Sequence, residues 1–120
     1  MLQARSALTW LVRLFLAALV VQFFFAGAGA FGAESWDLHS AFGFGLVAGS
    51  LAILVVAALA RQSLVLGALL FGAMLLQMVL SQLVDTSAWV ASLHAVNALA
   101  VLGLAGSLAA RAARSRVPAA

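Results

Sequence analysis

Four long apolar runs, separated by short polar segments, dominate the pattern of the chain. The runs are residues 8–31, 36–60, 64–84 and 88–110. Each is long enough for the roughly 20 helical residues that cross the hydrocarbon of a bilayer. The segments between them are short, and connections this short join antiparallel helices. The pattern predicts an all-α fold, a polytopic membrane four-helix bundle that forms one domain over residues 1–120.

Residues that favour helix starts occupy two of the breaks. Ser35 suits an N-cap position, and Asp37 follows it in the first turn, where a negative charge is favourable. Asp85, Thr86 and Ser87 offer the same chemistry before the fourth run. The second and fourth helices are therefore expected to begin at these breaks.

The composition excludes a soluble globular domain. Apolar residues make up 67% of the chain and charged residues 8%, against roughly 45–50% and about 25% in soluble domains. The chain contains no cysteine, which excludes disulfides, thiolate zinc sites and iron–sulfur clusters. Its net charge of +3 comes from arginines that flank the apolar runs, which is a topology signal rather than a nucleic-acid-binding surface.

The charged residues predict the orientation of the bundle. The arginines, all on one side of a four-span arrangement, are Arg5, Arg13, Arg61, Arg111, Arg114 and Arg116. The acidic residues, all on the other side, are Glu34, Asp37 and Asp85. The positive-inside rule then places both termini, including a basic tail over residues 111–120, in the cytoplasm of a bacterial-type plasma membrane. Trp36 and Trp89 mark the outer interface, and Trp10 marks the inner one.

The first apolar run also has some features of a cleaved signal peptide. Arg5 precedes it, and the small residues 28–30 resemble a cleavage site. The run is longer than the apolar core of a typical signal peptide. We therefore expect a retained first helix.

A 55-residue shift superimposes the two halves of the sequence. The shift aligns the two histidines of the chain, His39 and His94, and it aligns Gln22 with Gln77. It also lays the first two runs over the last two without a gap, which indicates an internal repeat. Two hairpins in the same orientation are related by a pseudo-twofold axis along the membrane normal. His39 and His94 are then expected at equal depth, facing each other across that axis.

The residues one helical turn after each histidine complete a candidate site. Gly43 and Ala98, at the i+4 positions, are small and leave space beside each imidazole. Phe42 and Asn97, at the i+3 positions, are the other candidate cofactor contacts. Gln22 and Gln77, which lie deeper, are expected to form interhelical hydrogen bonds rather than to touch a cofactor.

Two facing imidazoles with no third protein ligand favour a haem iron as the bound metal. Zinc and copper sites normally need three or four protein ligands, whereas a porphyrin brings four nitrogens of its own. His39 and His94 as axial ligands would give a six-coordinate b-type centre suited to electron transfer. Each ring should donate its other N–H to a backbone carbonyl one turn back or to serine.

Other interpretations of the histidines remain open at this point. A polar residue in a membrane helix often only holds helices together, and a histidine near the headgroups can be interfacial. The chain would then be a cofactor-free structural or assembly protein. A proton relay or another metal is a further alternative. A transporter or channel is disfavoured because no charged residue lies at mid-membrane, and the sequence offers no catalytic residues for an enzyme.

Two stretches resemble a known family. They are VVQFFFAGAGAFGAESWDLHSAFGFGLVAG and LQMVLSQLVDTSAWVASLHAVNALAVLGLAG, which are similar to the two hairpins of one four-helix half of haem A synthase. The resemblance covers nearly the whole chain and implies a bundle around a b-type haem, with His39 and His94 as axial ligands. Small uncharacterised four-helix membrane proteins share the pattern.

The chain departs from haem A synthase in ways that bear on activity. The catalytic half of that family has a glutamate three residues before its first histidine and an arginine just after it, where this chain has Trp36 and Ser40. The family also has two bundles, and this chain has one. The resemblance therefore implies haem binding without haem A synthase activity.

One haem near one surface cannot carry electrons across about 30 Å of hydrocarbon by itself. A quinone, a second haem or a redox partner protein is therefore expected as a partner. A homodimer would restore a two-bundle assembly.

Overall fold

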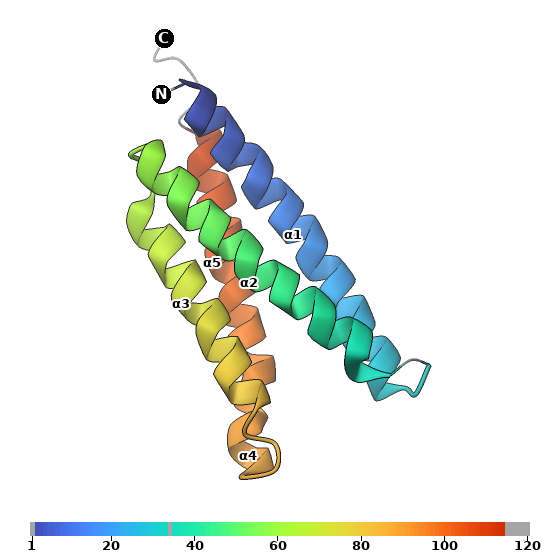
Figure 1. Ribbon diagram of the computed structural model, residues 1–120. Coiled ribbons are helices and arrows are strands. Elements are labelled where there is room, and N and C mark those ends of the chain that lie inside the picture. The colour runs from blue at the N-terminus through green and yellow to red at the C-terminus, as the bar shows by residue number, and fades with distance from the viewer. Residues whose placement is uncertain (1, 34, 115–120) are drawn as a thin grey trace.

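The computed structural model describes residues 2–33 and 35–114, which fold as a bundle of helices (Figure 1). The helices are α1 (Leu2–Ala30), α2 (Trp36–Leu59), α3 (Leu64–Ser81), α4 (Ala88–Ala91) and α5 (Leu93–Arg114). The short α4 continues into α5 after Ser92, and the two form one apolar segment of 27 residues. The predicted all-α four-helix bundle is confirmed.

Four helical segments are long and apolar enough to cross a membrane. They contain 29, 24, 18 and 27 residues in chain order, counting α4 and α5 together. The first helix begins earlier than the predicted residue 8, because the polar residues near its start continue the helix. The third ends at Ser81 rather than 84, since residues 82–86 form turns. Helix α5 runs through Arg111 to Arg114, so this part of the predicted basic tail is helical, and Arg116 lies outside the described residues.

The helix starts follow the expected chemistry. Ser35 caps α2, and its hydroxyl oxygen accepts from the backbone N–H of Asp37 at 3.3 Å. Ser87 caps α4 and accepts from the N–H of Val90 at 3.4 Å. The turn between α2 and α3 is tight, with φ of 50° at Arg61 and 58° at Ser63, both in the left-handed region.

The helices form a ring in which each packs against two neighbours. Helix α1 packs against α2 and α5, and α3 packs against the same two helices. Within the described residues, the diagonal pairs, α1 with α3 and α2 with α5, make no backbone contact. A twofold rotation that exchanges the α1–α2 hairpin with the α3–α5 hairpin preserves this arrangement. The pseudo-twofold architecture inferred from the sequence is therefore present.

The 55-residue repeat also governs which residues are buried. The buried residues of α2 are Leu46, Ser50, Ile53 and Ala57. Those of α5 are Val101, Ala105, Leu108 and Ala112, which the same shift relates one by one to the buried residues of α2. Val12, Phe15 and Leu19 of α1 have buried counterparts in Gly67, Leu70 and Met74 of α3. The two hairpins thus present equivalent faces to one shared core.

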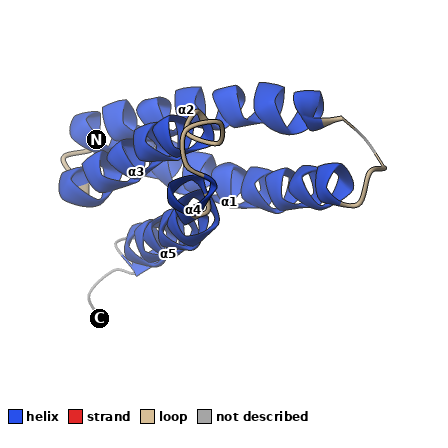
Figure 2. Cartoon of the chain, turned by 90° about the horizontal axis from the view of Figure 1, so that it is seen from below, coloured by secondary structure: helices blue, strands red, loops and turns tan. Residues whose placement is uncertain are grey.

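The bundle is packed at one end and open at the other. The start of α1, the end of α5 and the α2–α3 turn lie together at the packed end (Figure 1). Seen from the α4 end, the α1–α2 hairpin extends away from α3 and α5 (Figure 2). Arginines 61, 111 and 114 belong to the packed end, and Asp37 and Asp85 to the open end. Charge is therefore segregated along the bundle as the sequence predicts, while Glu34 lies outside the described residues.

Candidate functional site

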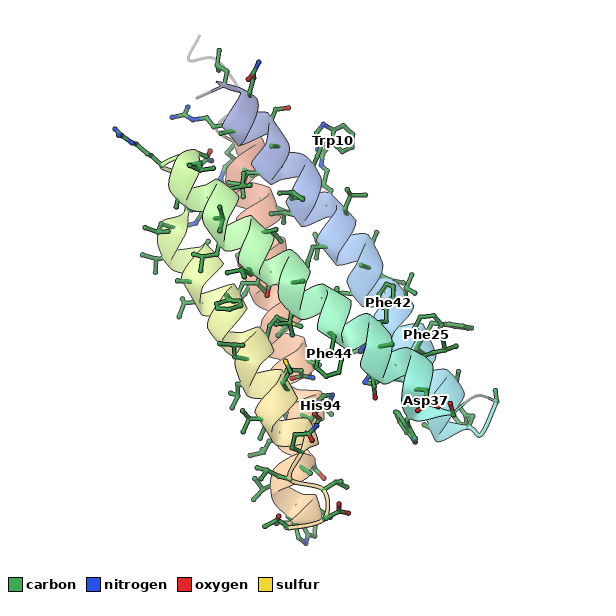
Figure 3. All side chains as sticks on the ribbon, viewed as in Figure 1. Trp10, Phe25, Asp37, Phe42, Phe44 and His94 are labelled. Carbon is green, nitrogen blue, oxygen red and sulfur yellow. The ribbon has the colours of Figure 1, made fainter. Side chains whose placement is uncertain are left out.

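A cavity of about 450 Å³ lies between the diverging hairpins. Its wall is built from α1, α2, α3 and α5, and includes both histidines. Figure 3 shows Phe44 and His94 where the two hairpins separate. The volume lies within the roughly 300–1,000 Å³ of sites for small molecules and cofactors.

The wall of this cavity follows the internal repeat. Most residues of the first hairpin that line it have counterparts in the second hairpin, related by the same shift, that also line it. They include the pairs Gln22 and Gln77, His39 and His94, and Gly43 and Ala98. The cavity therefore surrounds the pseudo-twofold axis, where a symmetric ligand would meet equivalent surfaces from both hairpins.

The two imidazoles approach each other across this axis. The ring centroids of His39 and His94 are 6.2 Å apart, and the rings are tilted by 59°. The histidines come from α2 and α5, the diagonal helices whose backbones do not touch. Trp36 packs edge-on against His39, with ring centroids 5.5 Å apart. Facing histidines were expected from the repeat, and the structure brings them together.

Hydrogen bonds from α3 hold the ring of His94. Its Nδ1–H donates to the backbone carbonyl of Gln77 at 3.0 Å. Because the carbonyl can only accept, this bond places the proton on Nδ1 and leaves Nε2 with a lone pair. The side-chain amide of Gln77 in turn donates to the His94 carbonyl at 2.9 Å. The expected N–H to carbonyl bond is present, but its acceptor lies on the neighbouring helix rather than one turn back.

His39 is held differently. The Gln22 side-chain amide donates to the His39 carbonyl at 3.0 Å, as the repeat predicts, and lies 3.3 Å from the ring nitrogen Nε2. Because this amide nitrogen only donates, Nε2 is the acceptor in that contact. Ring atom Nδ1 is buried and has no hydrogen-bond partner within the described chain, and the same holds for Oε1 of Gln22.

The four other residues predicted to contact a cofactor fall into two groups. Gly43 and Ala98 line the cavity. A Cβ at Gly43 would lie 3.2 Å from the Gln22 amide nitrogen, so the space that glycine leaves is used by that side chain. Asn97 instead bonds to α3, donating to the Ala73 carbonyl at 2.8 Å and to Oε1 of Gln77 at 2.6 Å.

Phe42 also lies outside the cavity. It packs edge-on against Phe25 of α1, with ring centroids 5.5 Å apart, on the side of the first hairpin that faces away from α3 and α5 (Figure 3). In both hairpins the i+3 residue thus turns toward the neighbouring helix of its own hairpin.

Sequence reasoning missed several residues of the cavity wall. Gln22 and Gln77 form the expected interhelical bonds, yet they also line the cavity. Met78 and Phe23 also contribute to the wall. These two residues are related by the 55-residue shift, so applying the repeat to every position would have found them.

Comparison with known proteins gives one positive match. The model of a family of unknown function, DUF6220, matches residues 22–86, more than half of the chain. The chain belongs to the DUF6220 family. The matched part of this DUF6220 protein contains Gln22, His39 and Gln77 and ends before His94. No curated protein and no solved structure matches. The resemblance to haem A synthase stays a prediction.

The geometry of the DUF6220 site can be tested against a haem iron. An ion bound at about 2 Å by one nitrogen of each ring would place collinear ring centroids about 6 Å apart, close to the observed 6.2 Å. Each neutral ring has one nitrogen with a lone pair: Nε2 of His94, and Nε2 of His39, which the Gln22 amide contacts at 3.3 Å. The described residues contain no group of three or more histidine, cysteine or acidic side chains. A haem iron, which brings four porphyrin nitrogens, would need only these two rings as protein ligands.

Proposed function

We propose that this DUF6220 protein binds one b-type haem in a membrane, with His39 and His94 as axial ligands, and acts in electron transfer or haem handling. The observation that carries the proposal is the pair of imidazoles. They come from diagonal helices, their centroids are 6.2 Å apart, and they flank a cavity of about 450 Å³. Two histidines that only packed would not need an open cavity around them.

The protein supplies the ligands, their orientation and an apolar enclosure. The Gln77 carbonyl accepts from Nδ1–H of His94, which fixes the tautomer and makes the opposite nitrogen a better ligand. Leu46 and Val101, one from each hairpin, contribute apolar wall. When bound, haem would supply one-electron redox chemistry, and a second histidine would leave no open position for other reactions.

Charge supports an orientation for this assembly. Arg61, Arg111 and Arg114 lie at the packed end, opposite Asp37 and Asp85. By the positive-inside rule, we infer that the packed end faces the cytoplasm of a bacterial-type plasma membrane and that the cavity lies near the outer surface. A quinone or a redox protein on that side would then exchange electrons with the haem, and a homodimer would bring two such sites together.

A second candidate is a cofactor-free structural or assembly protein. The observation that favours it is the pair of equivalent bonds from Gln22 and Gln77 to the backbone carbonyls of the histidines. Such bonds join neighbouring membrane helices whether or not a cofactor is present.

Titration with hemin separates these candidates. Protein purified without haem is titrated in detergent, and the visible spectrum is followed. We expect saturation at one hemin per chain and a low-spin spectrum, because both axial positions are filled by imidazole. The double variant His39→Ala/His94→Ala should lose this spectrum.

The matched control is Ser40→Ala, which changes the cavity wall without removing a ligand nitrogen. It should bind hemin as the wild type does. If the wild type shows only the spectrum of free hemin, or if the double variant retains the low-spin spectrum, the haem proposal is wrong. A folded wild type that leaves the spectrum of free hemin unchanged would favour the structural candidate.

A further inference from the structure

The two halves of the site differ at one repeat position that controls their hydrogen bonds. Asn97 stands at the i+3 position after His94, and Phe42 stands at the i+3 position after His39. Both side chains turn toward the other long helix of their own hairpin, Asn97 toward α3 and Phe42 toward α1. Asparagine can donate hydrogen bonds there, and phenylalanine cannot.

On the His94 side this difference completes a chain of hydrogen bonds. Asn97 donates to the Ala73 carbonyl at 2.8 Å and to Oε1 of Gln77 at 2.6 Å. The Gln77 amide is thereby oriented with its nitrogen toward the His94 carbonyl, to which it donates at 2.9 Å. The backbone carbonyl of Gln77 accepts from the His94 ring at 3.0 Å. His94 is therefore held both at its backbone carbonyl and at its ring.

On the His39 side the same chain is interrupted. Phe42 offers no donor, and Oε1 of Gln22 is buried without a partner in the described chain. Ring atom Nδ1 of His39, whose counterpart in His94 donates to a carbonyl, is also buried without a partner there. The Gln22 amide lies 3.3 Å from Nε2 of His39 and offers that nitrogen a hydrogen bond. The backbone carbonyl of Gln22 lies near this ring without completing a hydrogen bond to Nδ1, and a hydrogen-bond donor competes for the other ring nitrogen.

We propose that the two histidines are unequal ligands, with His94 the firmly held one and His39 the exchangeable one, and that Gln77 and Asn97 are positioning residues for His94. This inference rests on the proposed haem site. Its consequence is that a small neutral ligand of reduced haem, such as carbon monoxide, enters on the His39 side. With haem bound, the imidazole of His39 would give up its place on the iron to carbon monoxide, and His94 would keep its own. The released imidazole stays neutral, and the Gln22 amide is in place to donate to it.

The test compares single-histidine variants loaded with hemin. His39→Ala should retain haem as a five-coordinate centre that binds carbon monoxide rapidly after reduction with dithionite. His94→Ala should bind hemin about 10–100-fold more weakly than His39→Ala, the range that loss of supporting hydrogen bonds produces at metal sites. The reduced wild type should bind carbon monoxide more slowly than His39→Ala, because His39 must leave first.

A second comparison keeps both histidines and tests the positioning residues. Asn97→Leu removes the donor to Gln77 at similar size, and Phe42→Leu is the matched change at the equivalent position of the other hairpin. Asn97→Leu should speed displacement of imidazole by carbon monoxide, because His94 then becomes exchangeable as well. Phe42→Leu should leave the rate within about twofold of the wild type. A residue that only stabilised the fold would not change the exchange rate selectively.

The outcomes distinguish this inference from the proposed function. If the wild type binds no hemin, the haem site itself is wrong. If it binds hemin but the two histidine variants lose it equally, or His39→Ala loses more, the inequality is overturned while the haem site stands. Circular dichroism checks that the variants fold. If His94→Ala does not fold, the test uses the rates at which carbon monoxide displaces imidazole in Asn97→Leu and Phe42→Leu. Equal rates in these two variants overturn the inference.

Discussion

The packed end and the open end of the bundle follow different rules. At the packed end Leu8, Leu70 and Leu108 are fully buried. The open end instead surrounds a cavity whose wall includes both histidines. Lipid tails are as apolar as leucine, so exposing apolar side chains to them costs little. The packed end therefore stabilises the bundle, and the open end can keep a cavity.

Small residues explain why the packed end can be close-packed. A Cβ at Gly67 would lie 3.4 Å from both the Ala57 Cβ and the Leu54 Cα, so α2 and α3 approach closely at this point. Ala57, Ala105 and Ala112 are nearly or fully buried in the same half. Close backbone approach increases van der Waals contact, which is a main source of helix association in membranes.

The largest effect is expected from a cavity made in the packed end. Leu70→Ala should lower the free energy of unfolding by about 2–5 kcal/mol, because the side chain is fully buried among its neighbours. Leu69→Ala, at the adjacent and 53% exposed position, is the matched control and should change stability little. Reversible unfolding in mixed detergent measures both. Equal losses would show that the packed end is not the main source of stability.

A smaller effect is expected when the same substitution is placed at each end. Ala105→Leu adds volume to a fully buried site and should destabilise by about 1–3 kcal/mol. Ala98→Leu, two turns earlier on α5, adds the same volume to the cavity and should leave stability nearly unchanged while reducing hemin binding at least tenfold. Unfolding and hemin titration of the two variants provide the measurements. Unchanged hemin binding in Ala98→Leu would show that hemin does not bind in this cavity.

The smallest effect compares two glycines of α2. Gly45→Ala should stabilise by roughly 0.5–1 kcal/mol, since glycine is a poor helix former and the added Cβ meets nothing within 4 Å. Gly43→Ala should gain less, because its Cβ would lie 3.2 Å from the Gln22 amide nitrogen. The difference between the two free energies of unfolding is the quantity to measure. A larger gain at Gly43 would mean that the Gln22 amide is not held where the structure has it.

Much of the fold follows from the apolar pattern, because helix length and short connections leave few alternatives in a membrane. The break between α4 and α5 does not follow from it. There the Ser92 hydroxyl donates to the Ala88 carbonyl at 2.8 Å, a local bond of the kind that bends helices. A single serine in an apolar run does not reveal whether its hydroxyl will make such a bond.

The sequence predicts the features that the two halves of the candidate site share, but not those in which they differ. The repeat that relates Gln22 to Gln77 and His39 to His94 was sufficient to place the two rings opposite each other. The roles of Phe42 and Asn97 were not accessible, because the i+3 and i+4 positions both lie near the same helix face. Which of them faces the cavity depends on how the two hairpins diverge, a property of packing rather than of local sequence.

The most direct test of the central claim is the electron paramagnetic resonance spectrum of the oxidised protein after loading with one equivalent of hemin. Two imidazole ligands on one iron predict a low-spin ferric signal, converted to a high-spin signal in His39→Ala. A high-spin signal in the wild type, or a low-spin signal that survives removal of both histidines, would contradict the account.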